Sequence, residues 1–474
     1  MVALPSIPVS RTLLERGLRG LVEAWRGIAG GDRVPVSRDG TLEPRDVERL
    51  RSLLNECLEA RGGEVSARAR AATLGQLYLD LSDEGKRTFL QVLATGFAAD
   101  AAALDKAIAE VQAATDPAAR HMAERRLRQA LTPPRQRLLT QFTSLPQGVK
   151  FLVDMRADAL RFRKEAPELA ILDADLEDIF VAWFDVGFLE LKRITWNSPA
   201  ALLEKLIAYE AVHAIESWDD LRNRLDADRR CYAFFHPRMP LEPLIFVEVA
   251  LVKGIAGNVQ ALLDQSVPVL DAKEADTAIF YSISNTQVGL RGISFGNFLI
   301  KRVVDDLSRD LPNLKTFSTL SPIPGFRKWL DEAVAKGTPD LVTAEAREAL
   351  GQVLGKRFSK GQLPALLKDY AWVENRALAD TLRPVLMRLG ARYLLTVDEN
   401  GRPRDPVARF HLSNGASVHR LNWLGDRSRN GLKQAAGLMV NYLYRLDDID
   451  QNHERFVRDG TIAASAEVRR LADL

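Results

Sequence analysis

The chain has little cysteine, no long hydrophobic run and no excess of charge of one sign, and each absence excludes a class of protein. Its 474 residues include two cysteines, Cys57 and Cys231, which are far apart and outside any metal-ligand spacing. Two reduced core thiols are therefore expected, and a disulfide framework is not. Lys and Arg number 65 and Asp and Glu 63, a net charge of +2. That balance argues against a nucleic-acid partner, which would require excess basic charge.

The hydrophobic segments are too short to cross a membrane. The longest, such as residues 244–252, have the length of a strand and include Glu248. The first residues, MVALP, lack a basic segment followed by an apolar one, and the last, RRLADL, are not a Ser-Lys-Leu peroxisomal signal. We therefore expect a soluble cytoplasmic protein with no membrane partner.

Up to Trp196 the apolar residues recur at helical spacing, and β-branched runs are scarce. Asp116-Pro117 has the form of a helix N-cap followed by proline at the first helical position, and Thr132-Pro133-Pro134 repeats the device. No catalytic constellation is visible here. The sequence therefore predicts a helical domain, residues 1–196, that serves packing or oligomerisation.

Residues 197–474 have a different pattern and predict an α+β domain. Segments rich in Phe, Ile, Val and Tyr predict strands at 231–235, 244–252, 277–284 and 314–320, and an amphipathic helix is expected at 295–307. Residues 327–390 predict a helical insertion. The Asn-Gly pair at 414–415 predicts a β-hairpin over 411–418, and a final long helix is expected from 428 to 446.

The segment TFSTLSPIPGF at 316–326 places two serines, Ser318 and Ser321, on a turn directly after a predicted strand. Pro322 and Pro324 cannot continue a strand ladder, because proline supplies no N–H donor and fixes φ. Both hydroxyl groups are therefore held on a stiff turn, where side chains can point into a cleft.

A glycine-containing segment, QVGLRGISFG at 287–296, connects a predicted strand to the amphipathic helix. Its glycines let backbone N–H groups approach a ligand closely, and a helix N-terminus favours an anion such as a pyrophosphate. A tight strand-to-helix turn explains the same residues equally well. The spacing resembles the loop with which the GCN5-related N-acetyltransferase superfamily binds coenzyme A, with Gln287, Gly289, Arg291 and Gly292 as the matching positions.

His411 is the histidine we single out, since it lies beside the predicted hairpin turn among apolar residues. Such a histidine is more often a core residue than a catalyst. His419 is expected on the opposite arm of the hairpin, and His213 and His236 lie earlier in this domain. None has the spacing of a zinc site.

Several segments, in one order, resemble the malonyl-CoA decarboxylase family. The matching segments are RCYAFFHP (230–237), SISNTQ (282–287) with the glycine loop after it, FLIKRVV (298–304), FSTLSPIPGF (317–326), FHLSNGA (410–416), NW (422–423) and GLMVNY (437–442). The resemblance implies a helical assembly domain followed by a catalytic domain with a mixed sheet of the acetyltransferase type. It also implies a homo-oligomer, a dimer or a dimer of dimers, formed through the helical domain.

The resemblance further implies conversion of malonyl-CoA to acetyl-CoA and CO2 without metal, biotin or pyridoxal phosphate. It assigns the catalytic roles to Ser318 and His411, with Ser321 as the alternative serine. A histidine can protonate the enolate that loss of CO2 leaves behind, while the serine orients the carboxylate or the histidine. Together with Gln287, Ser318, Ser321 and His411, the substrate-binding residues are those of the acyl-CoA loop: Val288, Gly289, Leu290, Arg291, Gly292, Ile293 and Ser294.

Two other functions fit the same fold. An acyl-CoA-dependent N-acyltransferase would require an added amine for turnover. A non-catalytic malonyl-CoA sensor would bind the thioester without converting it. The presence of both the serine and the histidine segments favours the decarboxylase.

Overall fold

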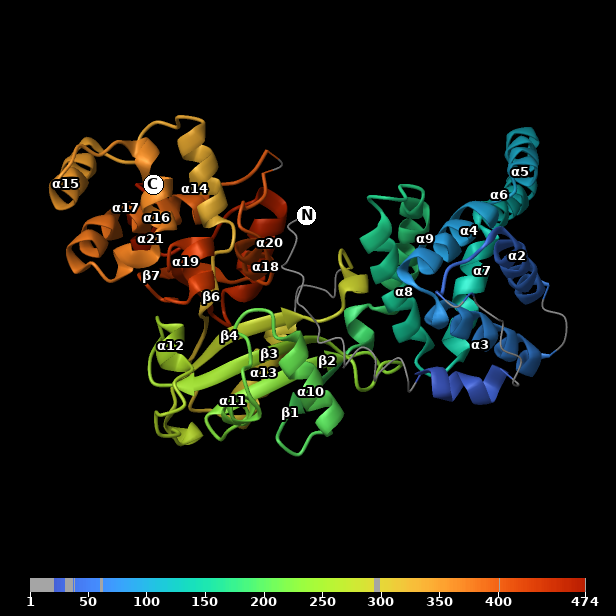
Figure 1. Ribbon diagram of the computed structural model, residues 1–474, viewed down its shortest axis with the longest axis horizontal. Coiled ribbons are helices and arrows are strands. Elements are labelled where there is room, and N and C mark those ends of the chain that lie inside the picture. The colour runs from blue at the N-terminus through green and yellow to red at the C-terminus, as the bar shows by residue number, and fades with distance from the viewer. Residues whose placement is uncertain are drawn as a thin grey trace.

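The computed structural model describes residues 21–29, 37, 39–59, 63–293, 299–399 and 401–473. Helices gather at one end of the molecule, a sheet lies in the middle, and a second group of helices lies at the other end (Figure 1). The first group comprises a helical segment at 21–29, α2 (Pro44–Leu58), α3 (Glu64–Asp80), α4 (Asp83–Gly96), α5 (Ala101–Ala113), α6 (Pro117–Leu131), α7 (Pro134–Gln141), α8 (Gly148–Phe162) and α9 (Leu169–Trp183).

The helix starts predicted from the sequence in this group are observed in the structure. The Asp116 carboxylate accepts hydrogen bonds from the N–H groups of Ala118 and Ala119 and caps α6, and Pro134 begins α7. The α5–α6 hairpin projects from the rest of the domain (Figure 1). Cys57 and Cys231 are buried free thiols, as predicted.

The prediction of helices up to Trp196 is wrong in its last residues. Strand β1 (Glu190–Ile194) pairs antiparallel with β2 (Arg229–Phe235). The segment after α9 is short, and its apolar residues Leu191 and Ile194 are too few to form the apolar face of a helix. The segment therefore pairs with the edge of the sheet.

The sheet is mixed, as the α+β prediction requires. Its order is β1-β2-β3-β4-β5-β8-β6, with β7 paired to β8. Among the described pairs of named strands only β4 and β5 are parallel, and the predicted strands at 231–235, 244–252, 277–284 and 314–320 are confirmed. The remaining strands are β3 (Pro243–Val252), β4 (Thr277–Asn285), β5 (Thr316–Thr319), β6 (Ser321–Pro322), β7 (Ser417–Asn422) and β8 (Met439–Tyr444).

Helices cover both faces of the sheet. On one face, α10 (Ala200–Tyr209) and α11 (Trp218–Arg224) enclose a small core with β2, while α13 (Leu299–Asp310) contributes to the large core on the other face. The part of the predicted amphipathic helix that is described, from Leu299, buries Leu299, Val303 and Leu307. Phe295 lies outside the described residues.

The helical insertion is confirmed, and the C-terminal helices complete the domain. None of the helices in the described ranges is long and hydrophobic enough to span a bilayer. The other α-helices described within residues 197–474 are α12 (Val259–Leu262), α14 (Phe326–Ala335), α15 (Ala344–Leu354), α16 (Leu363–Lys368), α17 (Arg376–Leu395), α18 (Pro406–Ser413), α19 (Arg429–Ala435), α20 (Ile449–Asp459) and α21 (Ala466–Leu471).

The predicted hairpin over 411–418 is wrong. Residues 406–413 form helix α18, and Asn414 has a φ of −93°, so the Asn-Gly pair ends a helix instead of forming a type I′ turn. Gly415, at φ +81°, supplies the left-handed residue that commonly follows a helix C-cap. His411 therefore lies on a helix, and His419, on β7, is not its cross-strand neighbour.

The predicted helix over 428–446 is also wrong, because the helix ends in the middle of this range and a strand follows. Helix α19 ends at Ala435, and Ala436 and Gly437 both have positive φ, at +51° and +78°. The next residues form β8, which is buried along its whole length between β5, β6 and β7. Because both faces of such a strand are buried, polar and apolar residues do not alternate along it, and its sequence looks the same as that of a buried helix.

Candidate active site

The sheet opens next to its only described parallel pair. Pairing of β4 with β5 ends at Phe280 and Thr319, and the Leu320 N–H still donates to the Phe280 carbonyl at 2.9 Å. The chain then leaves β4, and Ser321 pairs with β8 as part of β6. Residues 281–285 of β4 thus extend beyond the end of β5.

A β-bulge lies on β4 at this opening. Val249 pairs with Phe280 and Glu248 with Ser282, so Tyr281 is an extra residue in the ladder. The bulge takes the Tyr281 backbone out of register with β3. Backbone groups at this point are therefore candidates to bind a ligand.

Ser321 and His411 meet beside the opening and are both buried. Ser321 Oγ lies 3.2 Å from His411 Nε2, and the Tyr444 hydroxyl lies 2.8 Å from Nδ1. The Ser321 hydroxyl donates to Thr319 Oγ1 at 2.9 Å, and that oxygen also accepts the Tyr442 N–H at 3.1 Å. With Ser321 donating to Thr319, its oxygen accepts the Nε2 proton, and Nδ1 accepts from Tyr444.

Burial determines the charge of His411. Its side chain is 2% exposed and stacks on the Tyr442 ring, with the centroids 4.5 Å apart. Desolvation lowers the pKa of His411 from 6.5 to about 3. The imidazole is therefore neutral near pH 7, and a nearby anion would favour its protonated form.

Ser318 lies close to this pair in the sheet but bonds elsewhere. It is fully buried, and its hydroxyl donates to the Tyr442 carbonyl at 3.0 Å. Within the described ranges, no hydrogen bond joins Ser318 to His411, whereas Ser321 contacts the imidazole directly. Of the two serines on the turn, the structure brings Ser321 to the histidine.

Asp405 connects the serine turn to the histidine helix. Its Oδ1 accepts the N–H groups of Val407 and Ala408, both at 2.9 Å, and so caps α18. The Gly325 N–H and the Tyr393 hydroxyl also help to lower the pKa of Asp405, and a Cβ added at Gly325 would lie 3.8 Å from Asp405 Oδ2 and 2.0 Å from the Tyr393 hydroxyl. The close approach that requires glycine at residue 325 is therefore to the Tyr393 hydroxyl, while Asp405 would lie at ordinary van der Waals distance.

Burial raises the pKa of Asp405 from 3.8 to about 6, against the capping N–H groups that lower it. Replacing Asp405 with alanine removes the cap and leaves the part-buried N–H of Val407 and the buried N–H of Ala408 without their acceptor, so we expect a loss of about 1–3 kcal/mol in unfolding free energy and a lower kcat. Asp405→Asn keeps an acceptor for the N–H groups and should retain more of both.

The matched control for Asp405→Ala is Asp116→Ala, since Asp116 caps α6 with the same two-bond geometry far from the pair. Asp116→Ala should lower stability without changing kcat. Equal retention of kcat in the two alanine variants would contradict a role for Asp405 in positioning His411. Denaturant unfolding and steady-state kinetics measure both quantities.

The predicted acyl-CoA loop follows β4 directly. Gln287 is buried, and its amide donates to the Pro243 carbonyl at 3.0 Å, so this side chain holds the loop against the sheet. Gly292 has φ +88°, which favours glycine. Ser294 lies outside the described residues. In the rest of the loop, Val288 and Arg291 are exposed, and Gly289, Leu290 and Ile293 are buried.

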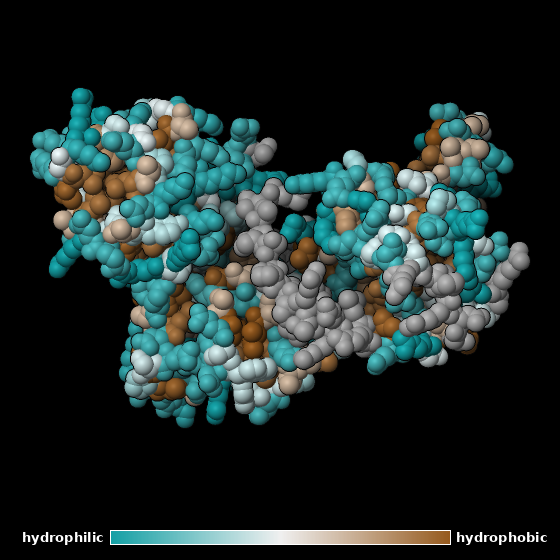
Figure 2. All heavy atoms as spheres, in the orientation of Figure 1, coloured by the Kyte–Doolittle hydropathy of each residue, from teal (hydrophilic) through white to brown (hydrophobic). Residues whose placement is uncertain are grey.

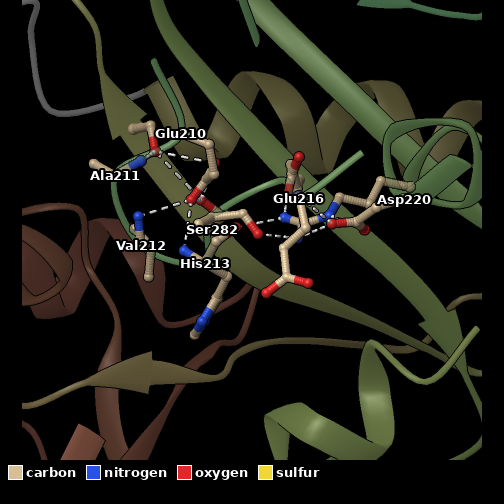
Figure 3. Close-up of polar contacts among 11 residues, drawn as sticks. Glu210, Ala211, Val212, His213, Glu216, Asp220 and Ser282 are labelled. Carbon is tan, nitrogen blue, oxygen red and sulfur yellow. Dashed lines mark hydrogen bonds and ion pairs between the residues drawn. The ribbon is translucent and has the colours of Figure 1, made fainter. Parts of the chain in front are cut away.

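A second polar cluster lies where α10 meets β4 (Figure 3). Both oxygens of the buried Glu210 carboxylate lie 2.8 Å from the Ser282 hydroxyl, and Oε1 also accepts the N–H groups of Val212 and His213 at 2.8 and 2.9 Å. Desolvation raises the pKa of Glu210. These bonds tie the end of α10 to the strand at its bulge.

Arg224 holds the other acids of this cluster. Its guanidinium pairs with Asp220 at 2.9 Å and with Glu248 at 3.1 Å. Burial raises the pKa of Glu248 to about 8 and lowers that of His213 to about 4. The acids accept hydrogen bonds from donors of the protein, so this cluster is a structural network. His236 also has a structural contact, since it accepts the Arg238 N–H at 3.1 Å.

Sequence reasoning missed Tyr444, Tyr442 and Asp405. Both tyrosines lie on β8, which the sequence predicted as a helix, and their spacing of two residues in MVNYLY is the signal that could have found them. Asp405-Pro406 repeats the Asp116-Pro117 device, and it could have predicted α18.

Among the described residues, no group of three or more histidine, cysteine, aspartate or glutamate side chains is arranged to hold a metal ion.

The structure combines a helical domain with a mixed sheet that opens next to a parallel strand pair. A strand–loop–helix segment and a buried serine–histidine pair lie at this opening. These features define an enzyme of the acetyltransferase-like fold. Two family models match the chain: "Malonyl-CoA decarboxylase N-terminal domain" over residues 97–184 and "Malonyl-CoA decarboxylase C-terminal domain" over residues 187–473. The chain belongs to the malonyl-CoA decarboxylase family.

Curated and solved relatives agree. The mitochondrial malonyl-CoA decarboxylase of Anser anser anser is 36% identical over 472 residues, 96% of this chain and 93% of that protein. The Mus musculus protein of the same name is 38% identical and covers 85% of each chain. The crystal structure of malonyl-CoA decarboxylase from Rhodopseudomonas palustris aligns with a TM-score of 0.81 at 46% identity, covering 90% of this chain and 99% of the other. That from Agrobacterium vitis gives a TM-score of 0.80 at the same identity and coverage.

Proposed function

We propose that this protein decarboxylates malonyl-CoA to acetyl-CoA and CO2, with Ser321 and His411 protonating the thioester enolate. The observation that carries this proposal is the buried 3.2 Å contact between Ser321 Oγ and His411 Nε2 beside the opening of the sheet. Family membership supports the reaction, and the geometry supports the roles of the residues. The resemblance assigns the serine role to Ser318, and the contact with the imidazole favours Ser321.

The proton balance explains why a neutral histidine suits this reaction. Breaking the bond between the carboxylate carbon and Cα releases CO2 and leaves its electron pair on the thioester enolate, which then takes up one proton. The malonyl carboxylate brings a negative charge to an imidazole whose pKa is lowered by desolvation alone. On substrate binding His411 takes up one proton from solvent. It then passes its Nε2 proton to the Ser321 oxygen while the Ser321 hydroxyl, turned from Thr319 toward the substrate, gives its own proton to Cα, and the imidazole returns to its neutral form.

The enolate oxygen needs hydrogen-bond donors that are in place before the reaction. The bulge at Tyr281 and the divergence of β4 from β6 support backbone N–H groups in that role. The loop over residues 288–294 would bind the coenzyme A diphosphate, with the positive φ of Gly292 allowing its backbone to approach the ligand.

The direct test is to incubate purified protein with malonyl-CoA alone and measure acetyl-CoA and CO2. We expect stoichiometric conversion without an acceptor, and unchanged turnover after treatment with a chelator, since the proposed chemistry uses no metal, biotin or pyridoxal phosphate. Turnover only with an added amine would indicate an N-acyltransferase. Binding of malonyl-CoA without conversion would indicate a sensor.

We also propose that the helical domain, assigned to residues 1–196, mediates a dimer or a dimer of dimers, with residues 197–474 as the catalytic domain in the cytoplasm. Pairing of β1 with β2 favours a boundary between α9 and β1. Hydrophobic residues are visible among hydrophilic ones on the projecting hairpin (Figure 2). The exposed ones on α5 and α6 are Ile108, Met122 and Leu131.

A further inference from the structure

A buried arginine of the helical domain holds the acyl-CoA loop. Arg156, on α8, is 2% exposed, and its Nη1 donates to the carbonyls of Gly289 and Arg291 at 2.9 and 3.0 Å. Its Nε donates to Asp173 at 2.8 Å and its Nη2 to Glu177 at 3.1 Å, both on α9. One side chain thus connects two helices of the first domain to a loop of the second.

These bonds assign Arg156 to positioning and not to binding the ligand. A guanidinium has five N–H donors, and the four bonds above use both donors of Nη1 together with Nε and one donor of Nη2. The two carboxylates more than balance its charge. Arg156 therefore offers little to a diphosphate directly, but it fixes the loop to which the diphosphate would bind.

The loop also lies directly against α8. A Cβ added at Gly289 would lie 1.7 Å from the Val153 carbonyl oxygen, so only glycine permits this approach. Since the described peptide bonds are trans, the N–H of Gly292 points opposite to the Arg291 carbonyl that Arg156 binds. Holding that carbonyl turns the Gly292 N–H away from α8.

We propose that Arg156 is a positioning residue for coenzyme A, through which the helical domain sets the loop that receives the diphosphate. The inference rests on the proposed acyl-CoA function of the loop. It gives the helical domain a part in substrate binding in addition to packing and assembly.

Arg156→Lys tests the proposal, because lysine keeps the charge beside Asp173 and loses the fork that binds two carbonyls. For malonyl-CoA, kcat/KM should fall about tenfold to a hundredfold, mainly through KM. For malonyl-pantetheine, which lacks the diphosphate and adenosine, the loss should be much smaller. Gly289→Ala, which forces the loop away from Val153, should give the same contrast between the two substrates.

The matched control is Arg163→Met, which removes another partner of Asp173 (3.2 Å) from the end of α8 without touching the loop. It should leave both substrates unaffected. Equal losses for the two substrates in Arg156→Lys, or no loss, would overturn the inference. If the wild-type protein converted neither substrate, calorimetric binding of coenzyme A would decide: weaker binding by Arg156→Lys upholds the inference while the proposed reaction fails, and equal binding overturns it.

Discussion

Replacing His411 with alanine is expected to lower kcat for malonyl-CoA decarboxylation by about 10²–10⁴-fold while the protein stays folded. The substitution removes the group that is 3.2 Å from Ser321 and 2.8 Å from the Tyr444 hydroxyl, so Ser321 loses the imidazole that supplies its proton. Chromatography of acetyl-CoA gives the rate, and circular dichroism shows whether the fold survives. Since the acid must be protonated in the complex, kcat of the wild type should fall as pH rises.

His419→Ala is the matched control, because His419 is a half-buried histidine on β7 outside the pair, and it should keep full activity. Full activity in His411→Ala would show that another group supplies the proton.

The pH dependence of stability offers a second measurement on His411. The folded-state pKa of about 3 lies below the unfolded value of 6.5, so the wild type loses stability as pH falls from 6.5 toward 3. At pH 5 this histidine accounts for about 2 kcal/mol of that loss, and His411→Ala should lack it.

Much of the fold could be predicted from local signals in the sequence. Asp116-Pro117 begins α6, and residues 244–252 and 277–284 form strands because long runs of buried, β-rich residues leave few alternatives. The errors are at 190–194, 411–418 and 428–446, and at the last two of these the local patterns fit two structures. Asn414-Gly415 suits a hairpin turn or a helix end, and only the capping of α18 by Asp405 decides between them.

The candidate site could be located from the sequence, but its contacts could not. The resemblance named the serine turn and His411, yet their meeting depends on β8, which pairs with β5 and β6 and brings Tyr442 and Tyr444 to the imidazole. The two-residue spacing of Tyr442 and Tyr444 indicates a strand, but no local rule predicts that this strand lies in the middle of the sheet. The choice between Ser318 and Ser321 depends on which face of a short, twisted segment each side chain occupies.

Ser321→Ala is expected to lower kcat by about 10²–10³-fold and Ser318→Ala by less than about tenfold. Ser321 contacts the imidazole, whereas the Ser318 hydroxyl donates to the Tyr442 carbonyl and serves the sheet. Losing that buried bond should cost Ser318→Ala about 1–3 kcal/mol in unfolding free energy, which denaturant unfolding measures. A larger loss of kcat in Ser318→Ala than in Ser321→Ala would favour the serine that the resemblance assigns.

The double variant Ser321→Ala/His411→Ala separates a shared path for the proton from two independent contributions. Residues that act as one unit give strongly non-additive losses, because removing either already breaks the path. The double variant should therefore be no more than a fewfold slower than His411→Ala alone. If the losses multiplied, the serine would act on the substrate independently of His411, for example by orienting the carboxylate. The 3.2 Å contact would then stabilise the site without transferring the proton.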